Sequence, residues 1–159
     1  MVATAKKEES SETIQTVNIV QQIDIDAPLE IAFEAVLTEL GPGSVLPDGS
    51  PFPMKIEAWP GGRWFRDLGE NVGHLWGHVQ VIKPPKLLEL SGPMMMSYPG
   101  VNFVQYRLTP TDSGGTLLTL THRAFGHIPA EHRAGFNEGW EHGIKRIRDL
   151  AARLAAKRS

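Results

Sequence analysis

The side chains that could carry acid–base chemistry are histidines and a tyrosine on predicted strands. His74 and His78 flank Trp76, and this spacing predicts both histidines on one face of a strand. His122 ends a predicted strand in the stretch LTLTHRAF, and Tyr106 lies on the strand before it. A histidine titrates near neutral pH, so each is a candidate general acid or base, or a hydrogen-bonding group for a bound molecule. The alternative in each case is an exposed histidine or a hydrogen-bonded core histidine.

The sequence predicts neither a metal site nor a known catalytic motif. On a strand, His74 and His78 would stand about 13 Å apart along the backbone, too far to share one ion. The chain has no cysteine, which excludes thiolate ligands, disulfides and a cysteine nucleophile. Nothing resembles a nucleophile elbow, a phosphate loop or a paired-carboxylate site. We therefore assign no catalytic residue, no metal ligand and no cofactor.

The stretch GFNEGWEHG at residues 135–143 has a glycine at every fourth position inside a predicted helix. Each glycine costs a helix interior roughly 1 kcal/mol relative to alanine. Residues four apart share one side of a helix, so the glycines form one row and large apolar side chains form the row beside it. The glycine row is Gly135, Gly139 and Gly143, and the apolar row is Phe136, Trp140 and Ile144.

The glycine row allows three interpretations. Missing side chains would leave a cavity for a small apolar ligand, with Trp140 as one wall. Alternatively, the helix backbone approaches the sheet closely and no void exists. A third reading is that the helix bends or begins late at these residues.

Aromatic and methionine residues supply further candidates for the lining of a pocket. Trp59 and Trp76 lie among strand aromatics, which are core residues by default. Met94–Met96 follow Gly92-Pro93 in a hairpin connection, and three flexible thioethers make an adaptable apolar surface. Three interpretations of that connection are open: a gate over a pocket, a contact for a partner, or a loop folded onto its own domain. Arg63 and Arg66 in GGRWFRD are candidates for binding a carboxylate.

Alternating and helical apolar patterns place these residues in an α+β fold. The element order is strand, helix, six strands and a long helix, and short connections between strands indicate an antiparallel sheet. One long helix then buries one side of that sheet. Predicted strands cover 17–25, 54–59, 62–67, 75–82, 86–91, 101–109 and 116–123, and predicted helices cover 27–40 and 129–156.

Composition limits the class of protein. The 159 residues suit a single domain at 14–159, preceded by a disordered, solvated tail at 1–13. A net charge of −2 without a basic stripe argues against nucleic acid or an anionic membrane as partner. The N-terminal residues lack the apolar core of a secretory signal, and no apolar run is long enough to span a membrane. We expect a cytoplasmic protein.

Several stretches in their order resemble one known superfamily. They are IDAPLEIAFEAV, WPGGRWFRD, WGHVQVIKPPKLLEL, TLLTLTH and GFNEGWEHGIKRIRDLAARL, and together they cover residues 17–155. The chain resembles the START-like (SRPBCC) superfamily, in the branch named for the C-terminal domain of the activator of the heat-shock-protein-ninety ATPase. The resemblance implies a helix-grip fold, with a curved antiparallel sheet of about seven strands wrapped around a long C-terminal helix. Members elsewhere in the superfamily hold lipids, sterols or polyketides between helix and sheet.

Three functions follow from the residues and the resemblance. The first is binding of a small hydrophobic, lipid- or polyketide-like molecule between sheet and helix. The second is a cyclase- or dehydratase-like enzyme that uses a histidine or Tyr106, and the third is an interaction module with a chaperone contact. Exposed sheet edges also leave a homodimer open. Predicted ligand-binding residues are Trp59, Trp76, His78, Met95, Tyr106, His122, Phe136, Gly139, Trp140 and Gly143.

Overall fold

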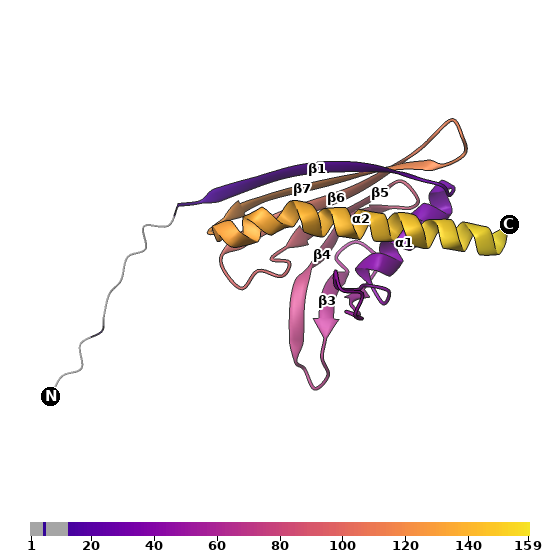
Figure 1. Ribbon diagram of the computed structural model, residues 1–159. Coiled ribbons are helices and arrows are strands. Elements are labelled where there is room, and N and C mark those ends of the chain that lie inside the picture. Colours follow the sequence, from indigo (N-terminus) through magenta and orange to yellow (C-terminus); the bar gives the residue numbers. More distant parts are fainter. Residues whose placement is uncertain (1–4, 6–12) are drawn as a thin grey trace.

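A computed structural model of the chain describes residues 5 and 13–159. Seven strands form one antiparallel sheet in the order β1-β7-β6-β5-β4-β3-β2 (Figure 1). The predicted tail at 1–13 lies outside the described residues except for its residues 5 and 13. The strands are β1 (Gln15–Ile25), β2 (Lys55–Ile56), β3 (Arg63–Asp67), β4 (Gly73–Lys83), β5 (Leu87–Gly92), β6 (Gly100–Pro110) and β7 (Thr116–Gly126).

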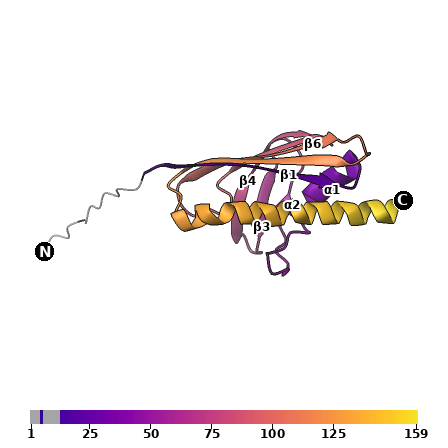
Figure 2. The ribbon, with the colours of Figure 1, turned by 45° about the horizontal axis from the view of Figure 1, so that its top comes forward.

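Both helices cover one face of the sheet, which we call the inner face, and leave the other, the outer face, uncovered (Figures 1 and 2). The long α2 (Ala130–Arg158) runs beneath the sheet. The shorter α1 (Leu29–Leu40) packs against α2 and against β6. The core forms between them because alternate strand residues point inward. Its fully buried members include Leu88, Leu90, Val104, Leu108, Leu118, Leu120, Ile147 and Ala151.

The predicted helix-grip fold is confirmed, and one strand is shorter than predicted. Residues 54–59 were expected to form a strand, but β2 contains only Lys55 and Ile56. The chain turns at Glu57, where the backbone N–H of Trp59 donates to the Glu57 carbonyl and that of Gly62 donates to the Trp59 carbonyl. Trp59 is consequently 57% exposed. Within the described residues, no helix is long and apolar enough to cross a membrane.

A β-bulge in β4 separates the two histidines that were predicted to share a face. Arg66 pairs with His74, whereas Arg63 pairs with His78, and the register shifts between those pairs at Trp64/Phe65. Cross-strand partners share a face, and the extra residue of a bulge reverses the alternation. His74 therefore lies on the inner face, and the exposed His78 lies on the outer face. The prediction of one shared face was wrong because strand periodicity carries no sign of a bulge.

The backbones of β4 and β5 approach closely where two glycines meet. A Cβ on Gly77 would lie 2.7 Å from the carbonyl oxygen of Ser91. A Cβ on Gly92 would lie 2.4 Å from the Cα of Gly77, and Gly92 has a φ of 156°. A side chain at either position would collide with the backbone of the facing strand, so glycine at both positions permits the close approach at this end of the β4–β5 ladder.

Replacing Gly77 tests this close approach. We expect Gly77→Ala to lower the free energy of unfolding by roughly 1–3 kcal/mol, because the added methyl group meets a backbone oxygen that cannot move alone. Urea denaturation followed by circular dichroism measures the change. An unaltered midpoint would show that the two strands have more room there than the structure gives them.

Candidate functional site

A chain of hydrogen bonds crosses the inner face of the sheet inside the apolar core. The indole Nε1–H of Trp140 on α2 donates to Nδ1 of His122 on β7 at 2.9 Å. His122 Nε2 lies 2.7 Å from Oδ1 of Asn102 on β6. The Asn102 amide in turn donates to the carbonyls of Gly92 at 3.1 Å and Pro93 at 3.3 Å. The chain thus links α2 to the connection between β5 and β6.

The partners of His122 determine its protonation. Trp140 can only donate, so Nδ1 accepts, and the ring proton of the neutral histidine resides on Nε2 and is donated to Asn102. His122 is 1% exposed, and this burial lowers its pKa to about 4 because the charged ring would lose its hydration. The ring is neutral near pH 7.

Both nitrogens of His122 are therefore occupied by protein groups. A general acid or base needs a nitrogen within hydrogen-bond reach of the substrate. In this arrangement His122 holds α2 and β6 in place, which corresponds to the hydrogen-bonded core histidine that was the alternative reading. Phe136 and Trp140 pack edge-on against its ring, with centroids 5.4 and 5.3 Å away.

A buried carboxylic acid that was not predicted lies on α1. Glu39 is 8% exposed, and its Oε2 is 3.4 Å from Nε of Arg146 on α2. Burial raises the pKa of Glu39 to about 7, and the nearby guanidinium offsets only part of that effect. Its position one turn after Ala35 and Val36, both buried, was the available sequence signal.

Tyr106 lies on the inner face close enough to Glu39 for their charges to interact. The side chain is 2% exposed. Burial raises the pKa of its hydroxyl above the ordinary value, and the charge of Glu39 raises it further. Glu39 and Tyr106 thus form a buried pair of acidic groups in protonated or partly protonated form near neutral pH.

The glycine row on α2 faces open space. A Cβ built on Gly135, Gly139 or Gly143 meets no atom within 4 Å. The helix runs without interruption from Ala130 to Arg158, so neither close backbone approach nor a late helix start explains the glycines. Gly135 and Gly139 are exposed, and Gly143 is half-buried. The cavity interpretation places the row against the sheet. In the structure the row instead borders the packed face of α2 and does not lie against the sheet.

The other predicted ligand-binding residues divide between the interior and the surface. Trp76, Phe136 and Trp140 are half-buried and pack against the core. Trp59, His78 and Met95 are exposed, and none of them lies within 4 Å of a Cβ built on the glycine row.

Met94 and Met96 fold back onto the protein. Met94 is 6% and Met96 is 4% exposed, and each belongs to an apolar cluster. Met95 alone points outward, with 51% of its surface exposed. This arrangement matches the reading of a loop folded onto its own domain for two of the three residues.

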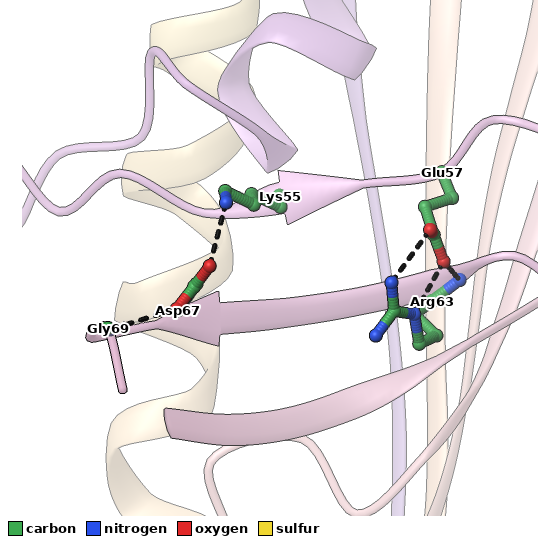
Figure 3. A network of polar contacts seen from close by, with 5 residues as sticks. All are labelled: Lys55, Glu57, Arg63, Asp67 and Gly69. Carbon is green, nitrogen blue, oxygen red and sulfur yellow. Dashed lines mark hydrogen bonds and ion pairs between the residues drawn. The ribbon is translucent and has the colours of Figure 1, made fainter. Parts of the chain in front are cut away.

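Two grooves lie on the outer face of the sheet. One, of about 430 Å³, is lined by apolar side chains that include Val101, Phe103 and Phe125. The other, of about 600 Å³, runs along β2 and β3. Figure 3 shows its ion pairs, Lys55 with Asp67 at 2.7 Å and Arg63 with Glu57 at 2.7 Å. These four charged side chains pair with one another, so none of them is left to bind a charged ligand.

Comparison with known proteins relates the chain to one family and to several solved structures. Residues 49–152 match the profile described as Activator of Hsp90 ATPase homolog 1-like protein. Among curated proteins, none matches the sequence.

The similar solved structures share the fold at low sequence identity. A protein from Rhizobium leguminosarum aligns with TM-score 0.69 at 14% identity, covering 91% of this chain and 99% of its own. CalU16 from Micromonospora echinospora aligns with TM-score 0.60 at 19% identity, covering 95% and 94%. DynU16, described as a protein of the dynemicin biosynthetic locus, aligns with TM-score 0.58 at 18% identity, covering 83% of this chain and 46% of DynU16.

The buried groups Glu39 and His122 predict opposite effects of pH on stability. The pKa of Glu39 is higher in the folded protein than its ordinary value of 4.5, so its contribution to stability falls as pH rises from 4.5 to 7. We expect Glu39→Gln to abolish this loss. The free energy of unfolding of the variant minus that of the wild type should increase by on the order of 3 kcal/mol across this range. Urea denaturation at half-unit pH steps measures the difference.

We expect His122→Gln to show the opposite dependence of stability on pH. The folded pKa of His122 is about 4, below its ordinary 6.5, so the wild type gains stability as pH rises through that window. The variant minus wild-type difference should therefore fall between pH 4 and 6.5. If the variant minus wild-type difference changed with pH in the same direction for both variants, the assigned burial of Glu39 and His122 would be contradicted.

The open space beside the glycine row predicts that alanine stabilises α2. We expect Gly139→Ala to raise the free energy of unfolding by up to about 1 kcal/mol, since the methyl group meets nothing and the helix gains propensity. For a chain of this size the change corresponds to a rise in Tm of about 2–4 °C, measurable by calorimetry. A fall in Tm would mean that the helix presses on a neighbour at this position.

Proposed function

Because the chain belongs to the Activator of Hsp90 ATPase homolog 1-like family of the SRPBCC superfamily, we propose that it binds a small hydrophobic molecule beside α2. The guest lies in the open space along the glycine row, next to the packed face of α2. Ligand pockets of this kind are mostly apolar and contain a few polar groups that orient the guest. Trp140 and Phe136 supply the apolar wall on the helix, and Trp76 supplies it on the sheet.

The observation that carries the proposal is the open space at three successive glycines. A helix with no packing reason for glycine sacrifices stability at each one. Such a cost is typical of a functional position, where stability is exchanged for room or access. Gly139 precedes Trp140 in the chain and Gly143 follows it by three residues, so both glycines lie on the turns of α2 that carry Trp140.

The similar structures support an organic ligand. DynU16 is described as belonging to a biosynthetic locus, and CalU16 shares the same fold with this chain. At 18–19% identity these likenesses concern the fold, so the lipid- or polyketide-like character of the ligand is our extension to this chain.

An acid–base enzyme of the cyclase or dehydratase type is the second candidate, and Glu39 favours it. A buried carboxyl whose pKa is about 7 is suited to proton transfer near neutral pH. Tyr106 lies close to it, whereas His122 has both nitrogens bonded to protein. The interaction module has less support, because Met94 and Met96 are buried and contribute no outward surface.

Filling the space tests the binding proposal. We use the neutral fluorescent probe N-phenyl-1-naphthylamine, whose emission rises in apolar surroundings. Gly139→Leu places a side chain in the open space without a clash at Cβ, so the fold is retained. We expect the Kd for the probe to rise at least about tenfold, the effect of losing about 1.4 kcal/mol of contact.

The matched control removes apolar surface from the groove on the outer face. Val101→Ser lies in that groove and on the other side of the sheet from α2. Its Kd should stay within about twofold of the wild type, and circular dichroism verifies folding of both variants. Weakened binding by Val101→Ser with no effect of Gly139→Leu would refute a site beside α2.

A further inference from the structure

The two arginines of GGRWFRD lie on opposite faces of β3 and differ in their partners. Arg63 is on the outer face, where its Nε and Nη2 donate to the two carboxylate oxygens of Glu57 at 2.7 and 2.9 Å (Figure 3). Arg66 pairs with His74 across the strands and lies on the inner face. Within residues 13–159, Arg66 takes part in none of the ion pairs described.

Arg66 is held against an aromatic ring. Its guanidinium carbon lies 3.7 Å from the centroid of Phe52, within range of a cation–π contact. The Phe52 ring stands 6.0 Å from that of Trp76. Arg66 Nε is buried and has no hydrogen-bond partner among the described residues. A buried donor without a partner costs free energy, and a bound acceptor would remove that cost.

His74 adds a second donor on the same face. Trp76 Nε1–H donates to His74 Nδ1 at 3.2 Å, so the neutral ring carries its proton on Nε2. Cross-strand partners have Cβ atoms about 5 Å apart, which brings the His74 ring beside the Arg66 side chain. Arg66 and His74 thus offer hydrogen-bond donors, and one of them carries a fixed positive charge.

We propose that Arg66 and His74 form the subsite for a single oxyanion group, a carboxylate or sulfonate, on the hydrophobic ligand. This inference rests on the proposed function and names the class of ligand: an apolar molecule that bears one negative charge. A guanidinium fork matches two oxygens of such a group. The single fixed positive charge of Arg66 balances one negative charge, whereas a phosphate dianion would leave an excess.

The aromatic side chains connect this subsite to the apolar site. Phe52 and Trp76 are half-buried and pack against the same core cluster as Trp140. A ligand whose ring or alkyl body lies along these side chains can place its charged end at Arg66. The proposal also explains why Arg66 on the inner face has no acidic partner among the described residues, whereas Arg63 on the outer face does.

Two probes that share one aromatic body separate the charge from the apolar contact. 1-Anilinonaphthalene-8-sulfonate differs from N-phenyl-1-naphthylamine only by its sulfonate. We expect Arg66→Gln to raise the Kd for the sulfonate probe about 10- to 100-fold, the value of a hydrogen-bonded ion pair. The Kd for the neutral probe should stay within about twofold. His74→Phe should weaken binding of the sulfonate probe alone, by a smaller factor.

Arg63→Gln is the matched control, because it removes an arginine from the same strand on the outer face. It should change neither Kd. An equal effect of Arg66→Gln on both probes, or no effect on either, overturns the oxyanion subsite and leaves the apolar site standing. If the wild-type protein binds the neutral probe and the sulfonate probe with the same Kd, the subsite is also overturned. A wild type that binds neither probe overturns the proposed function together with this inference.

Discussion

The attachment of α2 to the sheet depends on a short line of buried hydrogen bonds through His122. Trp140, His122 and Asn102 each use their polar atoms on one another or on the carbonyls of Gly92 and Pro93. A buried polar group left unpaired costs about 1–3 kcal/mol, so the line holds only if every member stays in place. It fixes the orientation of the N-terminal half of α2, because the fully buried residues of the helix, Ile144, Ile147 and Ala151, all lie from its middle onward.

That half of α2 is asymmetric about its axis. On one side Gln21 of β1 donates to the Asn137 carbonyl at 2.9 Å, and Arg133 donates to Gln15. At 3.6 residues per turn, Asn137 and Gly139 point about 200° apart, so the glycine row faces away from β1. One edge of the helix is therefore tied to the edge strand while the other borders open space. Access beside α2 follows from this arrangement without any movement of the sheet.

The sequence predicted the fold because its strands alternate and its turns carry strong signals. Ile19, Ile25, Val104 and Leu118 fall inward as the period of two requires. The bulge in β4 was not predictable, because it inserts one residue without altering the local composition, and it moved His78 to the outer face. Trp59 fell outside the interior for a similar local reason, the turn at Glu57.

The candidate site was predicted in part. The glycine row and Trp140 were found from helical spacing, whereas the role of the row depended on which side of α2 meets the sheet, and that is a tertiary property. Glu39 and Asn102 were missed because single polar residues within apolar patterns have no distinctive neighbours in sequence. Their burial is determined by the packing of α1 and β6 against distant elements.

Nuclear Overhauser contacts from the bound neutral naphthylamine probe test the central claim most directly. The account predicts contacts from the aromatic protons of the probe to the Hα protons of Gly139 and Gly143 and to the Trp140 indole. Contacts instead to Val101 and Phe125, in the groove on the outer face, would contradict it. The open edge of α2 would then have no part in binding.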